Sequence, residues 1–395
     1  MTRHEGNYSG RQTVLWAIAV ATCGVLPPFL TGGLAVQIRT ELGFGAAALG
    51  VAVSLFFTTQ ALASAPFGRI VERIGPRRGM QAAALGSAAS LLCIALFTSS
   101  WNGLIGFLVL GGFANAVSQV AANLALARGV RIERQGLAFG MKQAAIPTAT
   151  LLSGLAVPLV GTTVGWRWAF IGCALGACAI ACTMPKTTEG QVQRHTNERG
   201  DDMRPVPLIL LALGIGLGSA AAVPLGTFIV ESGVAAGFRV EFAGILLAVG
   251  GVVGIVVRLA LGWLADRRST GHLGIVAAML IAGTVGFVLL ATGVSWLFAL
   301  GTMLAFGAGW GWHGLFNFAV VKYNRNAPAA ATGITQTGAA AGSAVGPFLF
   351  GVILESTSYG TAWLSAGAAA LVAVAAILAG RWMLIRHLSA ASKSS

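Results

Sequence analysis

The charged residues of this chain fall in clusters and leave long uncharged intervals between them. Two of the intervals, 79–127 and 269–321, are too long for one membrane crossing of about 20 residues, and each has a polar, turn-forming stretch near its middle. We therefore divide each interval into two helices, and take Lys142 and Arg258 as charges inside helices. The pattern predicts an all-α membrane protein with twelve spans. They lie near residues 14–38, 46–68, 79–98, 102–127, 136–164, 167–185, 206–230, 242–265, 272–292, 295–321, 330–354 and 361–382.

Composition supports a membrane protein, because 56% of the 395 residues are apolar and only 9% are charged. The net charge of +13 is unevenly distributed: with both termini in the cytoplasm, 20 of the 25 Lys and Arg residues fall in inward segments. This is the positive-inside pattern, which predicts a multi-pass protein of the cell membrane with cytoplasmic termini. It also makes the lipid bilayer, and not a nucleic acid, the expected partner of the basic residues. The first apolar segment exceeds a signal-peptide core, so we keep it as a span.

Several other functional classes lack the residues they would need. The five cysteines lie inside predicted helices, and their odd number argues against a disulfide framework. The chain has neither a G-x-x-x-x-G-K-[ST] nucleotide loop nor an H-E-x-x-H zinc motif. The tails and the central loop are too short for the output domain of a receptor. We therefore expect no enzyme activity, no cofactor and no metal, and a monomeric protein.

The sequence contains an internal repeat. A shift of 194 residues aligns two regions of the chain with later regions, and a shift of 193 aligns a third. The repeat predicts two six-helix halves of parallel topology, residues 1–184 and 206–395, joined by a polar cytoplasmic linker at 185–205. The matched residues are Gly68, Glu72, Arg73, Asn123 and Arg128 with Gly262, Asp266, Arg267, Asn317 and Lys322, and Gly140 and Gln143 with Gly333 and Gln336.

Two related loops carry a candidate gating motif, G-R-I-V-E-R-I-G-P-R-R at 68–78 and G-W-L-A-D-R-R at 262–268. Glycine allows helices to approach closely, and an acid followed by arginines can form charge pairs that differ between two conformations. The first loop resembles the signature of the major facilitator superfamily, usually G-x-x-x-D-R-x-G-R-R, with Glu72 in place of the aspartate. The second resembles its degenerate copy. The candidate gating residues are Gly68, Glu72, Arg73, Gly75, Arg77, Arg78, Gly262, Asp266 and Arg267.

The resemblance extends over nearly the whole chain, including the Gly165-Trp166-Arg167-Trp168 entry to the sixth span. It implies the major facilitator fold and secondary transport by alternating access. The substrate is then expected near the membrane midplane, between the two halves. The resemblance does not imply a particular substrate.

Two intramembrane cations suggest a class of substrate. Arg258 precedes Asp266 by eight residues, about 12 Å along a helix, and Lys142 has a similar depth. Snorkelling of either side chain, or a bond from Arg258 to helix-end carbonyls, would be a structural explanation. The position of Arg258 four residues before Gly262 resembles the arginine that contacts the carboxylate in monocarboxylate and oxalate carriers of this superfamily. All twelve Asp and Glu residues fall at span ends or in loops, so an anionic substrate would neutralise the two cations.

Polar residues form a stripe on the fourth span, and the repeat places a second stripe on the tenth. In this superfamily these two helices line the central cavity, so the resemblance implies that both stripes face substrate. Hydrogen bonding between helices is the structural alternative. His313 is the one intramembrane side chain that ordinarily exchanges protons near neutral pH, unless it is packed and neutral. The stripes consist of Asn115, Gln119 and Asn123, and of Gly309, His313 and Asn317.

These features predict a proton-coupled symporter of a small organic anion, with a carboxylate as the expected substrate. The candidate substrate-binding residues are Arg258, Lys142, Asn115, Gln119, Asn123, His313 and Asn317, and His313 is the candidate proton-coupling residue. The alternative is a proton-driven exporter of drugs or amphipathic metabolites, which the apolar and aromatic lining favours. The absence of an acid in the middle of the membrane argues against that alternative.

Overall fold

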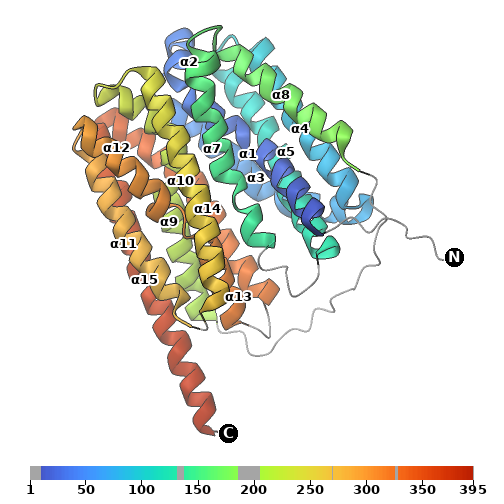
Figure 1. The fold of residues 1–395 in the computed structure, drawn as a ribbon, viewed down its shortest axis with the longest axis vertical. Coiled ribbons are helices and arrows are strands. Elements are labelled where there is room, and N and C mark those ends of the chain that lie inside the picture. The colour runs from blue at the N-terminus through green and yellow to red at the C-terminus, as the bar shows by residue number, and fades with distance from the viewer. Residues whose placement is uncertain (1–9, 131–137, 186–204, 269, 325–327, 395) are drawn as a thin grey trace, which may run out of the picture.

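The computed structural model describes residues 10–130, 138–185, 205–268, 270–324 and 328–394, and every regular element in them is helical. Most of the helices run roughly along the long axis of the molecule (Figure 1). Residues 138–142 form a further short helix before α7. The labelled elements are α1 (Gly10–Gly33), α2 (Ala35–Leu42), α3 (Ala46–Ile74), α4 (Pro76–Phe97), α5 (Trp101–Gly129), α7 (Ala145–Ala156), η1 (Val157–Gly161), α8 (Trp166–Thr183), α9 (Pro205–Ala235), α10 (Val240–Arg267), α11 (His272–Ala291), α12 (Ser295–Leu304), η2 (Ala305–Gly309), α13 (His313–Tyr323), α14 (Pro328–Ser356) and α15 (Tyr359–Ser394).

The predicted membrane fold is confirmed. Eleven helical segments of the described chain are long and apolar enough to cross a membrane. The remaining predicted span, the tenth at 295–321, is also helical, but it is divided into α12, the π-helical turn η2 and α13. Its Gly-Ala-Gly-Trp-Gly-Trp sequence at 307–312 explains the division, since closely spaced glycines weaken a regular helix. This span is therefore not one continuous α-helix.

Two helix interruptions leave backbone carbonyl groups free. The fifth span turns at residues 143–144, and Pro147 has no N–H to donate to the carbonyl group of Gln143, four residues before it. In the tenth span, residues 310–312 form a turn between η2 and α13, which places the carbonyl group of Trp310 outside a regular helix. Both carbonyl oxygens become acceptors in the candidate site.

The helices form two packed groups. In the N-terminal group, α1 to α8, α5 packs on α1, α3 and α4, and α4 also packs on α8. In the C-terminal group, α9 to α15, α9 packs on α14 and α15, and α15 also packs on α11. The groups meet where α3 contacts α14, α7 contacts α10, and α1 contacts α9. Most of the segment predicted to join the halves lies outside the described residues, so its boundaries stay a prediction.

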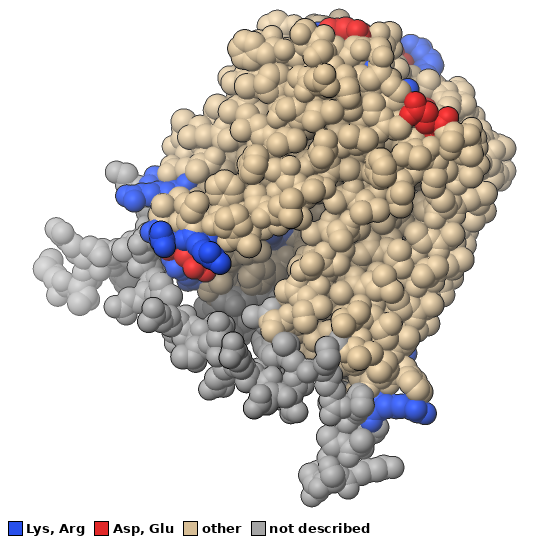
Figure 2. Space-filling model, turned by 180° about the vertical axis from the view of Figure 1, so that it is seen from behind, with Lys and Arg blue, Asp and Glu red and all other residues tan. Residues whose placement is uncertain are grey.

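Close approaches between the groups, at Gly32, Gly50 and Gly351, lie toward the end of the bundle that carries α2, at the top of Figure 1. Gly50 of α3 lies against the carbonyl oxygen of Pro347 of α14, so a larger residue would force these helices apart. At the other end, a Cβ atom added at Gly262 or Gly333 would have no described neighbour within 4 Å. In the space-filling view the charged side chains lie toward the two ends of the molecule, and most of the visible described surface between them is uncharged (Figure 2). We call the α2 end the closed end and the opposite end the open end.

Candidate functional site

Lys142 is buried, with 6% of its surface exposed, and its ammonium group donates to two amides of α5. The Nζ atom lies 2.5 Å from Oε1 of Gln119 and 2.9 Å from Oδ1 of Asn123. The two amides are neutral, so they solvate the ammonium group without cancelling its charge. None of the ion pairs found among the described residues involves Lys142.

The Lys142 contacts continue into a chain of amides across three helices. Because an ammonium group can only donate, Gln119 presents its oxygen to Lys142 and its Nε2 to Oδ1 of Asn115, 3.2 Å away. Asn115 in turn donates to Oε1 of Gln60 on α3, at 2.8 Å. Asn115 is buried, Gln119 is half-buried and Asn123 is exposed, so the polar stripe becomes more accessible along α5 toward the open end. We call Gln60, Asn115, Gln119, Asn123 and Lys142 the amide–lysine chain.

The C-terminal group repeats one link of this chain. Gln336 of α14 donates to Oδ1 of Asn317 at 3.0 Å, as Lys142 does to Asn123, and both pairs are 19 residues apart in the sequence. The equivalent of Gln336 is therefore Lys142 at a shift of 194, and the alignment of Gln143 with Gln336 at a shift of 193 is wrong. The sequence comparison matched identical residues, whereas the hydrogen bonds match equivalent positions.

The side chain of Arg258, on α10, links the C-terminal group to the N-terminal group. Its Nη1 donates to the carbonyl oxygen of Gln143 at 2.9 Å, and its Nη2 donates to the carbonyl oxygen of Trp310 at 3.1 Å. Only 7% of its surface is exposed, and its Nε has no hydrogen-bond partner among the described residues. The guanidinium therefore binds the two carbonyls freed by the helix interruptions and holds α10, the fifth span and the tenth span together.

His313 shares an acceptor with Arg258. Its Nδ1 lies 3.2 Å from the carbonyl oxygen of Trp310, and its Nε2 lies 3.0 Å from the hydroxyl of Ser219 on α9. Since a carbonyl oxygen only accepts, Nδ1 carries a hydrogen and donates to Trp310. In a neutral imidazole Nε2 then accepts from the hydroxyl of Ser219, because this hydroxyl can either donate or accept. The ring also stacks on Trp312, with 4.0 Å between centroids.

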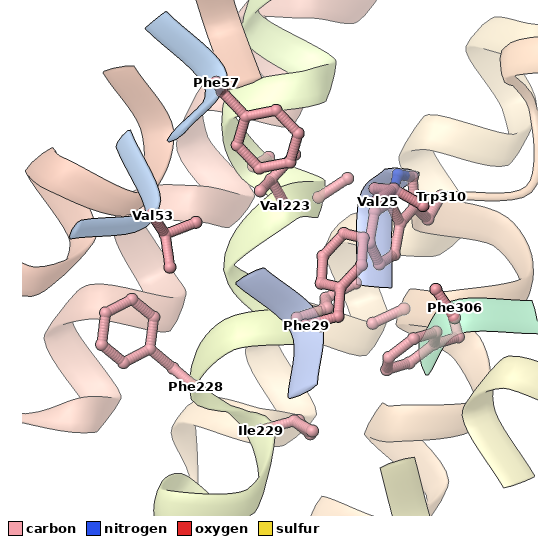
Figure 3. Packing of buried hydrophobic residues seen from close by; sticks show 14 of the residues in the cluster. Val25, Phe29, Val53, Phe57, Val223, Phe228, Ile229, Phe306 and Trp310 are labelled. Carbon is pink, nitrogen blue, oxygen red and sulfur yellow. The ribbon is translucent and has the colours of Figure 1, made fainter. Parts of the chain in front are cut away.

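Aromatic side chains from both groups pack together near these polar residues (Figure 3). Phe29 of α1 and Trp310 point toward each other across the group boundary, with ring centroids 5.6 Å apart. Phe57 of α3 and Phe306 of η2 extend the cluster on either side. Apolar surface and hydrogen-bonding groups are thus adjacent at the boundary.

The candidate gating residues lie at the open end. Glu72, Arg73, Arg78 and Arg267 are exposed, and Glu72 forms no ion pair within the described part of the chain. Gly75 separates α3 from α4 with a positive φ of 85°. Nothing is described for the side chain of Asp266, so the expected charge pairs of this motif stay a prediction.

The remaining motif residues also have local roles. Arg77 donates to the carbonyl oxygens of Pro185 and Met184, and so joins the start of α4 to the end of α8. The guanidinium of Arg267 stacks on Trp263 at 3.7 Å. Among the described residues, a Cβ atom at Gly68 would contact Val120 of the same group alone, so neither Gly68 nor Gly262 contacts a described residue of the opposite group in this conformation.

Sequence analysis missed three contributors to this region. Gln60 is a single amide in an apolar helix, and no sequence pattern marked it as part of a polar site. The acceptor for Arg258 did have a signal, because Pro147 leaves the carbonyl group of Gln143 without a helical donor. The pairing of Arg39 with Glu231 at the closed end joins residues 192 positions apart, and no local pattern predicts it.

The fold and the site together define a multi-pass membrane transporter, with two helix groups that meet at one end and buried polar residues at their boundary. The sequence profile of the Major Facilitator Superfamily matches residues 17–328, and the chain belongs to this superfamily of transporters, which are not enzymes.

Among curated proteins, the chain is similar to a chloramphenicol resistance protein of Streptomyces lividans. The two are 26% identical over 289 residues, covering 70% of this chain and 73% of the relative. Among solved structures, it is similar to a bacterial homologue of the human lysosomal transporter Spinster in an inward-facing and occupied conformation. The TM-score is 0.70, with 16% identity and coverage of 95% and 97%. A D-xylose–proton symporter gives a TM-score of 0.71 at 15% identity, with coverage of 93% and 97%. These structures share the fold.

Proposed function

We propose that this protein exports neutral or anionic amphipathic small molecules in exchange for protons. Its similarity to a chloramphenicol resistance protein over 70% of the chain supports export of a drug-like compound. The structural observation that carries the proposal is the engagement of Arg258 by two carbonyl groups of the protein. An arginine held in this way is not free to bind a carboxylate with two parallel hydrogen bonds, which removes one of the supports of the organic-anion hypothesis.

The proposed substrate site is the amide–lysine chain and the aromatic side chains beside it. Amides donate and accept, so they can bind hydroxyl, carbonyl or nitro groups of an uncharged molecule. The Lys142 ammonium has three N–H groups and uses two on Gln119 and Asn123, which leaves one for a substrate oxygen. The charges of Lys142 and Arg258 repel an organic cation. The site therefore favours neutral and anionic compounds.

Proton exchange is proposed at His313. A proton added to Nε2 turns this atom from an acceptor into a donor, so the Ser219 hydroxyl must rotate. The imidazolium then lies beside the guanidinium of Arg258, with which it shares the carbonyl oxygen of Trp310. Repulsion between the two cations weakens the bond that Arg258 makes to Trp310 within the C-terminal group. The same guanidinium donates to Gln143 of the N-terminal group, so its displacement would link protonation to the contact between the two helix groups.

The open end is proposed to face the cytoplasm. The basic loops of both gating motifs lie there, and the positive-inside rule places such loops on the cytoplasmic side. In this orientation the termini are cytoplasmic, and the present conformation is the one in which an exporter takes up its substrate.

A second candidate is symport of a small carboxylate, which the uncompensated charge of Lys142 favours. In that case the carboxylate would take the third N–H of Lys142, and Arg258 would leave one of its carbonyl partners during transport. The two candidates differ in direction and in substrate size. A single set of transport measurements separates them.

The test measures accumulation of radiolabelled compounds by cells that lack their own exporters. We expect expression of the protein to lower accumulation of chloramphenicol and of the anionic dye fluorescein, to leave the cation ethidium unchanged, and to lose its effect when a protonophore is added. Gln119→Ala should abolish export. Gln81→Ala is the matched control, because Gln81 bonds to α8 within the N-terminal group. Export of ethidium would contradict the site, and oxalate uptake without chloramphenicol export would support the symporter.

A further inference from the structure

The closed end contains a partly buried ion pair that joins the two helix groups. Nη1 of Arg39 on α2 lies 2.7 Å from Oε1 of Glu231 on α9. Only 6% of the Glu231 surface is exposed, and it is the one carboxylate among the described residues that is buried. Tyr359, at the start of α15, interacts electrostatically with both partners. The pair occurs only where the groups meet, so it must break when this end opens.

The sequence around Arg39 fixes its side chain toward α9. Gly43 has a positive φ of 68°, which ends α2 and turns the chain back. The carbonyl oxygen of Phe44 in this turn accepts a hydrogen bond from Nε of Arg39 at 3.0 Å. One edge of the guanidinium is thus held by its own turn, and another edge is presented to Glu231. The guanidinium of Arg39 is therefore already oriented toward Glu231 by its own turn, unlike a freely rotating surface side chain.

A second carboxylate of the C-terminal group acts nearby in a similar way. Oε2 of Glu355, at the end of α14, accepts from the backbone N–H of Ala47 in the first turn of α3, at 2.9 Å. The first turn of a helix has free N–H groups and a partial positive charge, so it attracts a carboxylate. In both contacts, a carboxylate of the C-terminal group therefore binds a positively charged or partially positive group of the N-terminal group.

The ion pair stabilises closure only modestly. Oε2 of Glu231 is buried and has no hydrogen-bond partner among the described residues. Removing charges from water costs free energy that offsets most of the attraction in one short ion pair, especially when one oxygen stays unsatisfied. A carrier needs such a balance, because a strongly closed end would not open during the transport cycle.

We propose that Arg39 and Glu231 form an electrostatic latch that keeps this end closed while the site is exposed at the open end, with Glu355 as a second, independent contact. The latch rests on transport by alternating exposure of one site and does not depend on which substrate is carried. Its state can therefore be measured without substrate. Failure of the export proposal would leave this measurement unaffected.

The test measures distances across the closed end by double electron–electron resonance. Spin labels are placed at Val164 and Val294, which are exposed in turns of the two groups, after replacement of the five native cysteines. We expect short distances to dominate in the otherwise unchanged protein. Arg39→Gln or Glu231→Gln should raise the ratio of long to short distances by about tenfold, because the first leaves the buried Glu231 carboxylate unpaired and the second leaves the half-buried Arg39 guanidinium unpaired. The exchanged pair Arg39→Glu with Glu231→Arg should restore much of the short-distance population.

The controls distinguish a latch from general damage. Arg239 and Glu241 form an ion pair within α10 and its N-terminal flank, so Glu241→Gln should leave the distances unchanged. Effects of Arg39→Gln and Glu231→Gln should not add, whereas Glu355→Gln and Glu231→Gln should act additively. If a glutamine variant does not fold, Glu231→Asp gives the same test with a smaller shift. An unchanged distance distribution in the folded single variants, or no recovery in the exchanged pair, would overturn the latch.

Discussion

Lys142 and Gln336 occupy equivalent positions in the two halves of the transporter, because each donates a hydrogen bond to the asparagine 19 residues before it. The distances are 2.9 Å to Asn123 and 3.0 Å to Asn317. The repeat thus carries a cation in one half and a neutral amide in the other. Because of this difference, the N-terminal side of the boundary between the halves carries a positive charge at Lys142. We expect the hydrogen-bond acceptors of a substrate to bind on that side.

The first prediction removes this charge while keeping a donor. Lys142→Gln makes the two halves alike, and the amide can still donate to Asn123. We expect the half-saturating concentration of an anionic substrate to rise by about tenfold or more, since a charge-assisted hydrogen bond is lost. The value for neutral chloramphenicol should change less than about threefold, because a neutral donor remains. Equal losses for both compounds would show that Lys142 acts on the structure and not on substrate charge.

The second prediction concerns Arg258, whose two Nη donors contact different helices. Arg258→Lys keeps the charge but cannot reach both carbonyl oxygens in the same geometry. We expect the maximal transport rate to fall by about tenfold with little change in substrate affinity, because the link between the groups is lost and the site is not. Rates and dissociation constants in proteoliposomes, at equal protein density, measure this. A large loss of affinity would make Arg258 a substrate ligand.

Pro147→Ala provides a companion variant without touching the arginine. Alanine supplies the N–H that proline lacks, so the carbonyl oxygen of Gln143 gains a helical donor that competes with Arg258. We expect the same loss of rate in a milder form. Ile146→Val, next to it in the sequence, is the control and should be neutral. A fully active Pro147→Ala would show that the free carbonyl group is dispensable.

The third prediction concerns proton coupling. Glutamine at position 313 can retain a hydrogen bond to Ser219 but cannot take up a proton near neutral pH. His313→Gln should therefore keep substrate exchange and lose the dependence of net transport on an imposed pH gradient. Exchange and net flux are measured on the same vesicles. Substrate accumulation driven by a pH gradient alone, in this variant, would remove His313 as the proton carrier.

The fourth prediction concerns the motif loops at the open end. Glu72 is exposed and unpaired within the described residues, as expected if its charge pairs form only when this end closes. Asp266→Asn should slow transport while leaving substrate affinity in place, because the closed state of this end loses a charge pair. A tenfold loss of affinity at unchanged maximal rate would contradict a gating role.

The sequence predicted the membrane fold well because hydrophobic length and charge distribution are properties of local segments. The amide stripe of α5 was also accessible, since Asn115, Gln119 and Asn123 recur every four residues in an otherwise apolar helix. The hydrogen bonds of Gln119 and Asn123 to Lys142 required only that the fifth span pack beside the fourth. These contacts lie within one helix group and follow from its helical order.

Contacts between the groups were not predictable in this way. Arg258 is four residues before Gly262 in the sequence, which suggested a substrate ligand, but its partners are carbonyl oxygens of two other spans. The pair of Arg39 and Glu231 was not predicted for a similar reason. Both residues lie near predicted span ends, where charged residues are common and give no indication of a partner. Which residues meet across the boundary depends on how the two groups pack. The local pattern of hydrophobic and polar residues does not predict this packing.

The direction in which protons move relative to the substrate tests the proposed export most directly. Purified protein is reconstituted into liposomes, and uptake of radiolabelled chloramphenicol is measured with the lumen either more acidic or more alkaline than the medium. A proton exchanger should accumulate the compound above its equilibrium level only when the lumen is acidic, and collapse of the gradient should release it. Gln119→Ala liposomes correct for passive entry. Accumulation only with an alkaline lumen would indicate symport and would contradict the proposed export.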